Sequence, residues 1–341
     1  MNLQLLRSEE EFVALREEWN ALAQQAATRS VFLSWEWQHL WWRHFGSGAQ
    51  LCLVGARDAG GRLRGLAPLQ QRQGADGRAA LRLLGDNDIS DYLDLLVRPE
   101  DAAAFAEALL PYLLRELGGW QTLELGCLPE GASARRLLGQ AGRSEGLKGD
   151  EAVETTSPML SLPESWEEYL AALPSKTRHE LRRKLRKAER EGRASLRLIR
   201  EPAEMPQALD TFFLLMQRSR PDKAAFLNER MQRFFREAAL TLCERGWLEL
   251  VELHSGSLPV ASLYVFDFAG TLHLYNSGFE PALTSLSPGL VVIAYHLRSG
   301  IERGRTGYDF MRGDEEYKYR FGATDTPLYR VCLERLGNPS P

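Results

Sequence analysis

The chain has 341 residues, of which 44% are hydrophobic and 26% charged, and its formal net charge is −4. This length suits two domains, and the slightly acidic balance excludes bulk attraction to a polyanion, so an anion site must come from local clustering. The four cysteines and six histidines are scattered, without a C-x-x-C pair or metal-ligand spacing. We therefore expect neither a disulfide framework nor a bound metal.

The N-terminus, residues 1–10, lacks the basic start and the apolar core of a signal peptide. No apolar run approaches the roughly 18 residues that a membrane helix needs. We expect a soluble cytoplasmic protein, either free or peripheral to the inner membrane.

The first half begins with apolar residues spaced by three or four, namely Phe12, Leu15, Trp19 and Leu22, which predict an amphipathic helix. Further on, two strand-like runs flank a turn rich in glycine at 57–61, as in a hairpin. The expected elements are helices at 9–23, 34–45, 100–117 and 132–141, and strands at 51–56, 62–70, 91–97, 121–125 and 153–160.

The second half repeats this order after Ser165, which begins a capping box with Glu168. Two glycine-containing turns, at 254–257 and 269–270, separate three strand-like runs. The expected elements are helices at 166–172, 175–190, 205–220, 225–245, 288–303 and 314–321, and strands at 248–253, 258–268, 271–278, 306–311 and 328–333.

The two halves therefore have one order of elements used twice, which predicts a tandem repeat. Hairpin strands followed by strand-helix-strand units predict an α/β (α+β) fold in which each repeat is a mixed, largely antiparallel sheet flanked by helices. We expect an N-terminal domain at 1–162 and a C-terminal domain at 163–341.

Three stretches of the second half carry a distinctive pattern: Tyr275-Asn276-Ser277-Gly278-Phe279, Ser287-Pro288-Gly289, and Asp309-Phe310-x-Arg312-Gly313-Asp314-Glu315-x-Tyr317-Lys318-x-x-Phe321-Gly322. They resemble the CelD/BioF2-like acetyltransferases of the GNAT superfamily, which are related to the FemAB peptidoglycan aminoacyltransferases. In the first half, Phe32-Leu33-Ser34-Trp35-Glu36-Trp37 with Trp41-Trp42, and Ser90-Asp91-Tyr92-x-Asp94, resemble the same family. The resemblance thus spans nearly the whole chain.

The resemblance implies tandem GNAT-like acyltransferase repeats that use acetyl-coenzyme A or another acyl-coenzyme A as co-substrate, without a metal. The C-terminal repeat would bind the coenzyme and catalyse transfer. The N-terminal repeat would be degenerate and shape the acceptor groove, because its helix start at 98–101 carries Glu100 and Asp101, which repel a pyrophosphate.

The segment around Ser287 has the composition of a helix start, with a capping serine before Pro288. A side-chain cap would leave the amides of Gly289, Leu290 and Val291 free at the positive end of the helix dipole, where a pyrophosphate binds well. The resemblance favours coenzyme binding here, with Ser285 and Ser287 as further donors. A helix start that is only well capped is the alternative.

Lys318 and its neighbour Tyr317 are candidate catalytic residues. Lys318 would stabilise the oxyanion at the attacked carbonyl or hold an acceptor phosphate. The resemblance implies a role in transfer for a lysine at this position, whereas the alternative is a surface lysine paired with nearby acidic residues. Asp309, at a strand end, would orient the acceptor amine or act as base, or else cap the following loop.

Candidate acceptor contacts come from three regions. The first region is the segment 91–94, in which polar and apolar residues alternate. The second region consists of the motifs 275–279 and 309–322 of the C-terminal half. The third is the basic segment 176–193, which would recognise a phosphorylated acceptor, anionic lipid headgroups or the coenzyme's 3′-phosphate, or else be a solvated face. The residues are Tyr92, Asp94, Tyr275, Arg312, Arg182 and Arg183. The tryptophans at 35–42 would stack on a sugar or pack in the core.

We expect an enzyme that moves an acyl group from acyl-coenzyme A to an amine, or to a hydroxyl, of a small-molecule, glycan or lipid-linked cell-envelope or polysaccharide precursor. The acceptor attacks directly, which agrees with the absence of a Ser/His or Cys/His pattern. One alternative is a FemAB-like enzyme with an aminoacyl-tRNA donor, although the acidic net charge argues against nucleic acid as a partner. Another is a non-catalytic adaptor on a membrane or synthase; the oligomeric state stays open.

Overall fold

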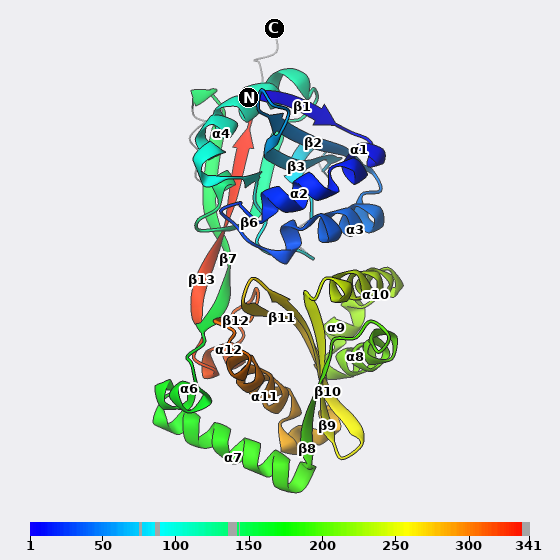
Figure 1. Cartoon of the computed structure of the whole chain (residues 1–341), viewed down its shortest axis with the longest axis vertical. Helices are drawn as coiled ribbons and strands as arrows, with labels where there is room; N and C mark the ends of the chain where they lie inside the picture. Colours follow the sequence, from blue (N-terminus) through cyan, green and yellow to red (C-terminus); the bar gives the residue numbers. More distant parts are fainter. Residues whose placement is uncertain (75–76, 86–88, 136–141, 143, 336–341) are drawn as a thin grey trace. The chain divides into compact units, whose positions relative to one another are not determined.

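The computed structural model describes the chain except residues 75–76, 86–88, 136–141, 143 and 336–341. Its described part divides into two compact units, one of Met1–Thr156 with Thr326–Pro341 and one of Ser157–Asp325. The chain leaves unit 1 within strand β7 (Lys148–Ser161) and returns to it within β13 (Thr324–Glu334) (Figure 1). The sequence suggests a single cut at 162, but the chain crosses twice because β13 pairs with β6 of unit 1.

Unit 1 contains a mixed sheet with the strand order β1-β2-β3-β4-β6-β13-β7. The pairs β1–β2, β2–β3, β3–β4 and β6–β13 are antiparallel, whereas β4 and β6 run parallel. A short strand, β5, pairs with β3. The bounds are β1 (Asn2–Leu6), β2 (Ala49–Arg57), β3 (Leu63–Gln73), β4 (Ala79–Leu83), β5 (Leu96–Val97) and β6 (Thr122–Pro129).

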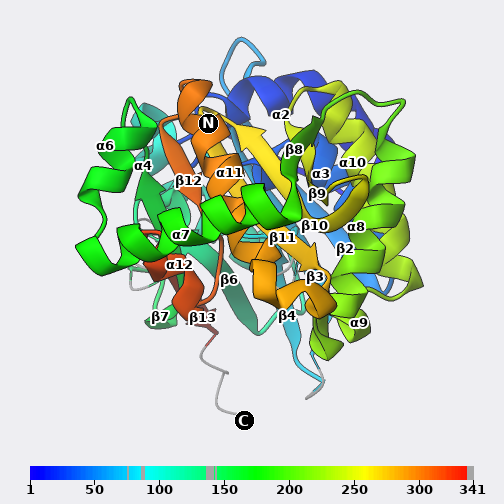
Figure 2. The ribbon, with the colours of Figure 1, turned by 90° about the horizontal axis from the view of Figure 1, so that it is seen from below.

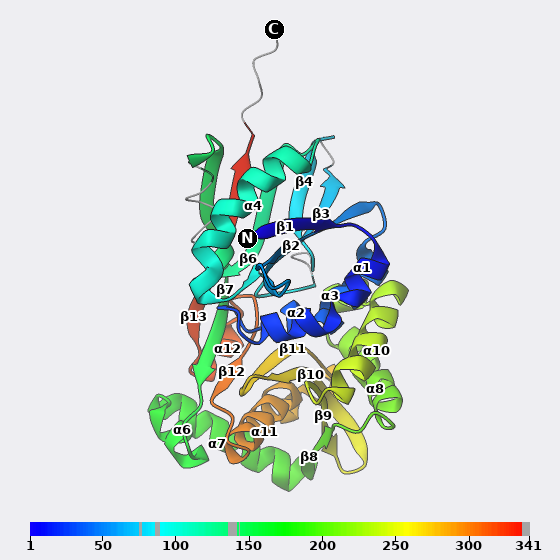
Figure 3. The ribbon, with the colours of Figure 1, turned by 45° about the horizontal axis from the view of Figure 1, so that its top comes forward.

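Helix α4 connects the two parallel strands of unit 1 and packs on the sheet at Gly65 of β3, where an added Cβ would lie 2.8 Å from the Phe105 ring (Figure 3). The helices α1, α2, η1 and α3 lie between β1 and β2 along the chain, and η2 leads directly into α4. The bounds are α1 (Glu9–Ala14), α2 (Arg16–Ala23), η1 (Val31–Leu33), α3 (Trp35–Phe45), η2 (Pro99–Asp101) and α4 (Ala102–Glu116).

The tryptophans of this unit pack in its core. Trp19, Trp37 and Trp41 are buried, and the indole of Trp37 donates to the Ser90 hydroxyl at 2.8 Å. The indole of Trp35 donates to the Phe12 carbonyl at 2.9 Å. Because these faces are covered by protein, the core-packing alternative holds for them rather than a sugar-stacking platform.

Unit 2 repeats the same arrangement. Its strand order is β7-β12-β11-β10-β9-β8, in which β11 and β12 run parallel and the other pairs are antiparallel. Helix α11 connects the parallel strands, as α4 does in unit 1. The bounds are β8 (Ala194–Ile199), β9 (Leu248–Ser255), β10 (Leu258–Phe268), β11 (Thr271–Phe279) and β12 (Gly307–Asp309). The expected α/β fold, a mixed sheet flanked by helices, is confirmed.

Helices cover both faces of the unit 2 sheet. Helices α8 and α10 pack on one face and α11 on the other (Figure 1), while α7 crosses beside α11 and η3 (Figure 2). The bounds are α6 (Trp166–Ala172), α7 (Ser175–Gly192), α8 (Met205–Ser219), α9 (Pro221–Phe226), α10 (Glu229–Glu244), η3 (Pro281–Leu286), α11 (Pro288–Glu302) and α12 (Glu316–Arg320). No described helix is both long and apolar enough to span a membrane.

Three expectations about elements need correction. The expected strand at 91–97 reduces to Leu96–Val97, because Tyr92 adopts a left-handed conformation with φ 55°. Strands β4 and β8 were not expected. The expected helix at 225–245 is two helices, since Asn228 caps a new one by accepting from the Met231 amide at 3.0 Å. The expected helix at 132–141 falls largely outside the described residues.

Candidate active site

The site begins where two parallel strands part. Strands β11 and β12 pair at three positions, the last being His273 with Asp309, and β11 then continues to Phe279 without β12 beside it. A pocket of about 320 Å³ opens beyond this point. Its walls come from the end of β11, the start of α11 and the helix α12, and the lining residues are Ser277, Phe279, Thr284, Ser287, Pro288, Gly289, Leu290, Ile293, Tyr317 and Phe321.

The start of α11 differs from the expected side-chain cap. Ser287 has φ 51°, and its hydroxyl makes no capping bond; instead its carbonyl accepts from the amides of Leu290 at 3.1 Å and Val291 at 3.0 Å. These two amides are therefore not free for a phosphate, which corrects the expectation. The Gly289 amide has no acceptor among the described residues. Of the three amides expected to bind a phosphate, only this one is therefore free to do so.

Gly289 also keeps the pocket open, since a Cβ at this position would lie 3.2 Å from the Phe279 ring. Of the other residues expected to bind the coenzyme, Ser287 and Leu290 line the pocket, whereas Val291 is buried in the core. Ser285 is not among the lining residues, and its carbonyl accepts from the Lys187 ammonium at 3.0 Å. The structure therefore brings together Ser287, Gly289 and Leu290 but not the whole expected set.

Asp309 ends β12 and is almost fully buried. One carboxylate oxygen, Oδ1, accepts from the Met311 amide at 2.8 Å and from the Ser157 hydroxyl at 3.1 Å. The other, Oδ2, lies 3.1 Å from Nδ1 of His273. This geometry matches the loop-capping alternative, because the carboxylate shapes the turn that follows the strand.

The loop after Asp309 wraps around the Lys318 ammonium. Nζ donates to the carbonyl oxygens of Met311 at 2.9 Å, Arg312 at 2.7 Å and Gly313 at 3.0 Å, and it pairs with Glu315 at 2.9 Å. Three carbonyls are enough to use all three protons of an ammonium group. In this conformation Lys318 holds the loop and has no proton free for an oxyanion.

Two residues allow the loop to curl in this way. Met311 adopts φ 61° and Gly313 φ 107°, and a Cβ at position 313 would lie 2.5 Å from the Glu315 carboxylate. The positive φ of residue 313 therefore favours glycine at this turn.

The neighbouring Tyr317 faces the pocket, where burial raises its pKa. The phenol thus keeps its proton at neutral pH and is available as a hydrogen-bond donor.

Several other predicted contacts do not line the pocket. Tyr275 packs its ring 5.7 Å from that of Phe235 on α10, and Arg312 contributes its carbonyl to the Lys318 ammonium. Arg182 and Arg183 are exposed on α7, where Arg182 pairs with Glu167 at 2.9 Å. Their expected roles toward an acceptor stay predictions.

Asp94 was expected to face an acceptor groove, and its burial corrects this. The side chain has no exposed surface and accepts from the Thr28 hydroxyl at 2.7 Å and from the amides of Leu95, Ser133 and Ala134 at 2.7 to 2.9 Å. Burial raises the pKa of Asp94, while these hydrogen bonds oppose the rise. Asp94 therefore joins three segments of unit 1. Tyr92, two residues earlier, lies in the left-handed turn.

Sequence reasoning missed a second lysine at the site. Lys223 of α9 is half-buried and donates to Ser277, a lining residue, at 2.6 Å to the carbonyl and 3.2 Å to the hydroxyl. Burial, with the positive charge of Arg220, lowers the pKa of Lys223 to about 8. The proline at position 221 is a helix-start signal that could have revealed α9, but nothing local indicates the contact with β11.

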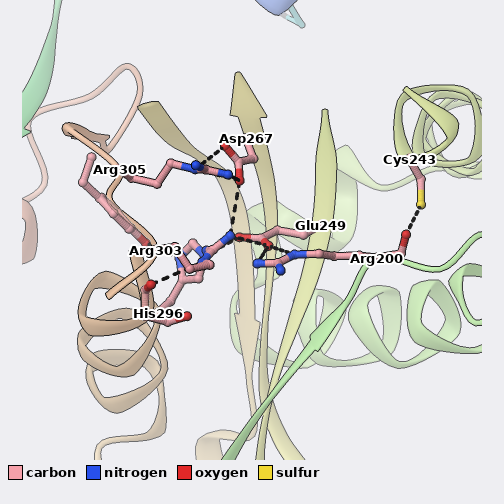
Figure 4. Close-up of polar contacts among 9 residues, drawn as sticks. Arg200, Cys243, Glu249, Asp267, His296, Arg303 and Arg305 are labelled. Carbon is pink, nitrogen blue, oxygen red and sulfur yellow. Dashed lines mark hydrogen bonds and ion pairs between the residues drawn. The ribbon is translucent and has the colours of Figure 1, made fainter. Parts of the chain in front are cut away.

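A buried charged cluster fixes the far end of α11 (Figure 4). The imidazole of His296 lies 2.7 Å from Glu249 and 3.0 Å from the Tyr308 hydroxyl, while Arg303 donates to both oxygens of Glu249. Burial alone would raise the pKa of Glu249, but His296 and Arg303 outweigh it and hold the pKa well below its usual range. The cluster joins α11 to β9 and β12, and so positions the opposite end of the helix at the pocket.

Residues 175–319 match the family model of the acetyltransferase (GNAT) domain. Residues 175–319 are a GNAT domain. This segment holds the parted strands, the start of α11 and the Lys318 loop, and it contains the lining residues of the pocket except Phe321. None of the curated proteins compared with the chain matches it.

Solved structures show that the fold extends beyond the GNAT domain. FemX has a TM-score of 0.66 at 12% identity, covering 97% of each chain. A conserved protein of unknown function from Bacteroides thetaiotaomicron has a TM-score of 0.62 at 13% identity, covering 97% of this chain and 100% of its own. L-PGS from Bacillus licheniformis has a TM-score of 0.57 at 10% identity, covering 97% of this chain and 93% of its own. The expected relation to FemAB-type GNAT proteins is confirmed at the level of fold.

The GNAT fold identifies acyl transfer as the general class of reaction. In the described part of the chain, no group of three or more histidine, cysteine, aspartate and glutamate residues could hold a metal ion. The pocket hydroxyls of Ser277, Thr284 and Ser287 have no histidine partner among the described residues. The pocket therefore offers a binding surface with a phenol and an amine beside it.

Proposed function

We propose that this protein transfers an acetyl or longer acyl group from acyl-coenzyme A to an amine, or to a hydroxyl, of a cell-envelope or polysaccharide precursor. The acceptor attacks the acyl carbon directly. The observation that carries this proposal is the pocket where β11 and β12 part, since it joins the start of a long helix to a buried phenol. A helix start attracts phosphate, and a phenol can protonate a leaving thiolate.

Each wall of the pocket has a role in this proposal. The coenzyme pyrophosphate binds at Ser287 and Gly289, next to the free amide, while Phe279 and Ile293 contact the apolar part of the donor. Tyr317 gives its proton to the leaving sulfur. Lys318 and Asp309 act as positioning residues, because their contacts fix the loop that presents Tyr317.

The proposed acceptor side includes the basic helix α7. Lys187 of this helix donates to the Ser285 carbonyl, two residues before Ser287, so α7 lies beside the N-terminus of α11. Arg182, Arg183 and their neighbours would then attract an anionic acceptor or the coenzyme's 3′-phosphate, and an anionic membrane is a further partner for the same face. We propose a cytoplasmic location, at or near the inner membrane.

The donor is tested by calorimetric titration with acetyl-coenzyme A, a longer acyl-coenzyme A and free coenzyme A. Saturable binding is expected for wild type, and Gly289→Glu should weaken it at least about tenfold because the carboxylate repels phosphate and the side chain meets Phe279. Gly118→Glu is the matched control, since Gly118 lies in unit 1 with open space around its Cα. Equal binding by Gly289→Glu and wild type would refute the donor site.

The basic helix beside the pocket favours one alternative, an aminoacyl-tRNA donor. The same titration with tRNA distinguishes the two enzymes. Binding of tRNA with no binding of any acyl-coenzyme A would replace the main proposal. Binding of neither, together with binding to anionic vesicles, would favour a non-catalytic adaptor.

A further inference from the structure

The pocket has a phenol to protonate a leaving group but needs a second group to prepare the acceptor. A primary amine is an ammonium ion at neutral pH and cannot attack a carbonyl carbon until it loses a proton. Asp309 is almost fully buried and already has the Met311 amide, the Ser157 hydroxyl and His273 as partners, and the Lys318 ammonium donates to three carbonyls. Neither residue has a site open for the acceptor proton.

Lys223 has fewer hydrogen-bond partners than Lys318. Its amine contacts Ser277, a lining residue of the pocket that lies four residues past the last position of β11 that pairs with β12. The carbonyl and hydroxyl of Ser277 can accept both N–H groups of a neutral amine, which leaves the nitrogen lone pair free. The contact therefore leaves one position on the nitrogen, which holds a proton in the ammonium form and the lone pair in the neutral amine.

Burial and the positive charges of Arg220 and Lys318 favour the neutral form of Lys223, whereas the carboxylates of Asp222 and Glu315 oppose it. On α9 itself, Asp222 is bound to Arg220 at 2.9 Å, and from the α12 side Glu315 is bound to Lys318 at 2.9 Å. The nearby carboxylates thus have other cations as partners, and no carboxylate lies within ion-pair distance of Lys223 in the described part of the chain. With its pKa lowered to about 8, roughly a tenth of the amine is neutral at pH 7.

We propose that Lys223 is the general base that takes a proton from the acceptor amine. This inference rests on the proposed acyl transfer. Lys223 accepts one proton from the acceptor ammonium, and the freed amine attacks the acyl carbon. The new C–N bond forms as the bond from that carbon to sulfur breaks. The sulfur takes a proton from Tyr317, which recovers one from the new amide nitrogen, and Lys223 returns its proton to solvent.

The protonation of Lys223 can be measured without knowing the natural acceptor. In protein labelled with ¹³C-lysine, the resonance that is missing from Lys223→Met identifies Lys223. We expect it to titrate near pH 8, about two units below the exposed lysines. Added acetyl-coenzyme A should shift it, since the donor fills the pocket beside Ser277. A resonance that titrates together with the exposed lysines would overturn the proposal.

Transfer from acetyl-coenzyme A to ethylamine, a minimal amine, tests the chemistry. Lys223→Arg keeps a positive hydrogen-bond donor at Ser277 but cannot lose its proton, so both Lys223→Arg and Lys223→Met should lose about 10²–10⁴-fold in kcat/KM. Lys148→Met, at an exposed lysine of unit 1, should match wild type. Thermal unfolding of all variants separates loss of the base from loss of fold.

The outcomes separate this inference from the proposed function. If wild type binds acyl-coenzyme A and Lys223→Arg transfers at the wild-type rate, Lys223 is not the base, while the proposed function stands. If wild type binds no acyl-coenzyme A, the proposed function fails, and with it the step assigned to Lys223. Binding of the donor, titration near pH 8 and loss of transfer in Lys223→Arg would support both.

Discussion

At the scale of single residues, the two lysines of the site have opposite surroundings. Lys318 donates to three carbonyl oxygens and pairs with a carboxylate, whereas Lys223 contacts one serine and lies near Arg220. The same residue type therefore serves as a fixed cation in one place and as a proton acceptor in the other. Residue identity alone does not separate these roles, because burial and partners decide the charge state.

The enclosure of Lys318 leads to a prediction about stability as well as activity. Lys318→Met leaves three carbonyl oxygens of a tight loop without a donor, so we expect a loss of about 3 kcal/mol in the free energy of unfolding. Lys184→Met is the control, because Lys184 pairs with Glu180 on an exposed helix and should cost less than about 1 kcal/mol. Urea unfolding measures both. A Lys318→Met protein as stable as Lys184→Met would mean that the loop does not depend on the ammonium.

At the scale of elements, α11 is held at both ends by different chemistry. Its start forms the pocket wall with Ser287 in a left-handed conformation, and its end joins β9 through Glu249, His296 and Arg303 (Figure 4). A rigid helix transmits the position of one end to the other. The buried cluster therefore matters for the site although it does not touch the pocket.

The buried cluster predicts a pH dependence of stability. The folded-state pKa of Glu249 lies below the unfolded value of about 4.3, so its contribution is complete above that pH and is lost as the pH falls further. At neutral pH, Glu249→Gln should lower the free energy of unfolding by about 3–5 kcal/mol, because Arg303 and His296 lose their buried partner. The difference from wild type should narrow between about pH 5 and about pH 3.

Urea unfolding across this pH range measures the effect. Glu302→Gln is the matched control on the same helix, since Glu302 pairs with Arg298 in an exposed position and should cost less than about 1 kcal/mol. A difference between Glu249→Gln and wild type that stayed constant with pH would show that the charge of Glu249 is not what stabilises the cluster.

At the scale of the whole molecule, the chain enters unit 2 through β7 and returns through β13. The strand β13 pairs with β6 from Leu328 to Glu334, so it completes unit 1 although it lies near the end of the chain. The second unit is therefore an insertion between two parts of the first. Removal of the C-terminal segment should therefore destabilise unit 1, most of which lies in the first half of the chain.

A chain that ends at Asp325 tests this arrangement. Strand β6 would lose the hydrogen-bonded neighbour that covers one of its edges, and its amides should exchange with solvent at least about tenfold faster. The amides of β10 in unit 2 provide an internal reference, because their partners β9 and β11 remain. Hydrogen exchange followed by mass spectrometry gives both rates. Unchanged protection of β6 would contradict the role given to β13.

Much of the fold could be predicted from local patterns. Apolar spacing and capping residues predicted α6 and β10 with their observed bounds, because periodicity and caps act within a few neighbouring residues. Strand β8 was missed, since six residues after a long basic helix give a weak alternating signal. The helix α9 was missed because it is short and follows α8 directly.

The sequence by itself determined the class of fold, the family of the second half and the segments that form the pocket, since each depends on motifs of contiguous residues. Only the tertiary structure decided where the side chains point. The left-handed turn at Met311 directs three carbonyls at Lys318, the burial of Asp94 removes it from any groove, and α9 brings Lys223 to Ser277. These contacts join residues from different elements, and their charge states follow from burial that no local pattern records.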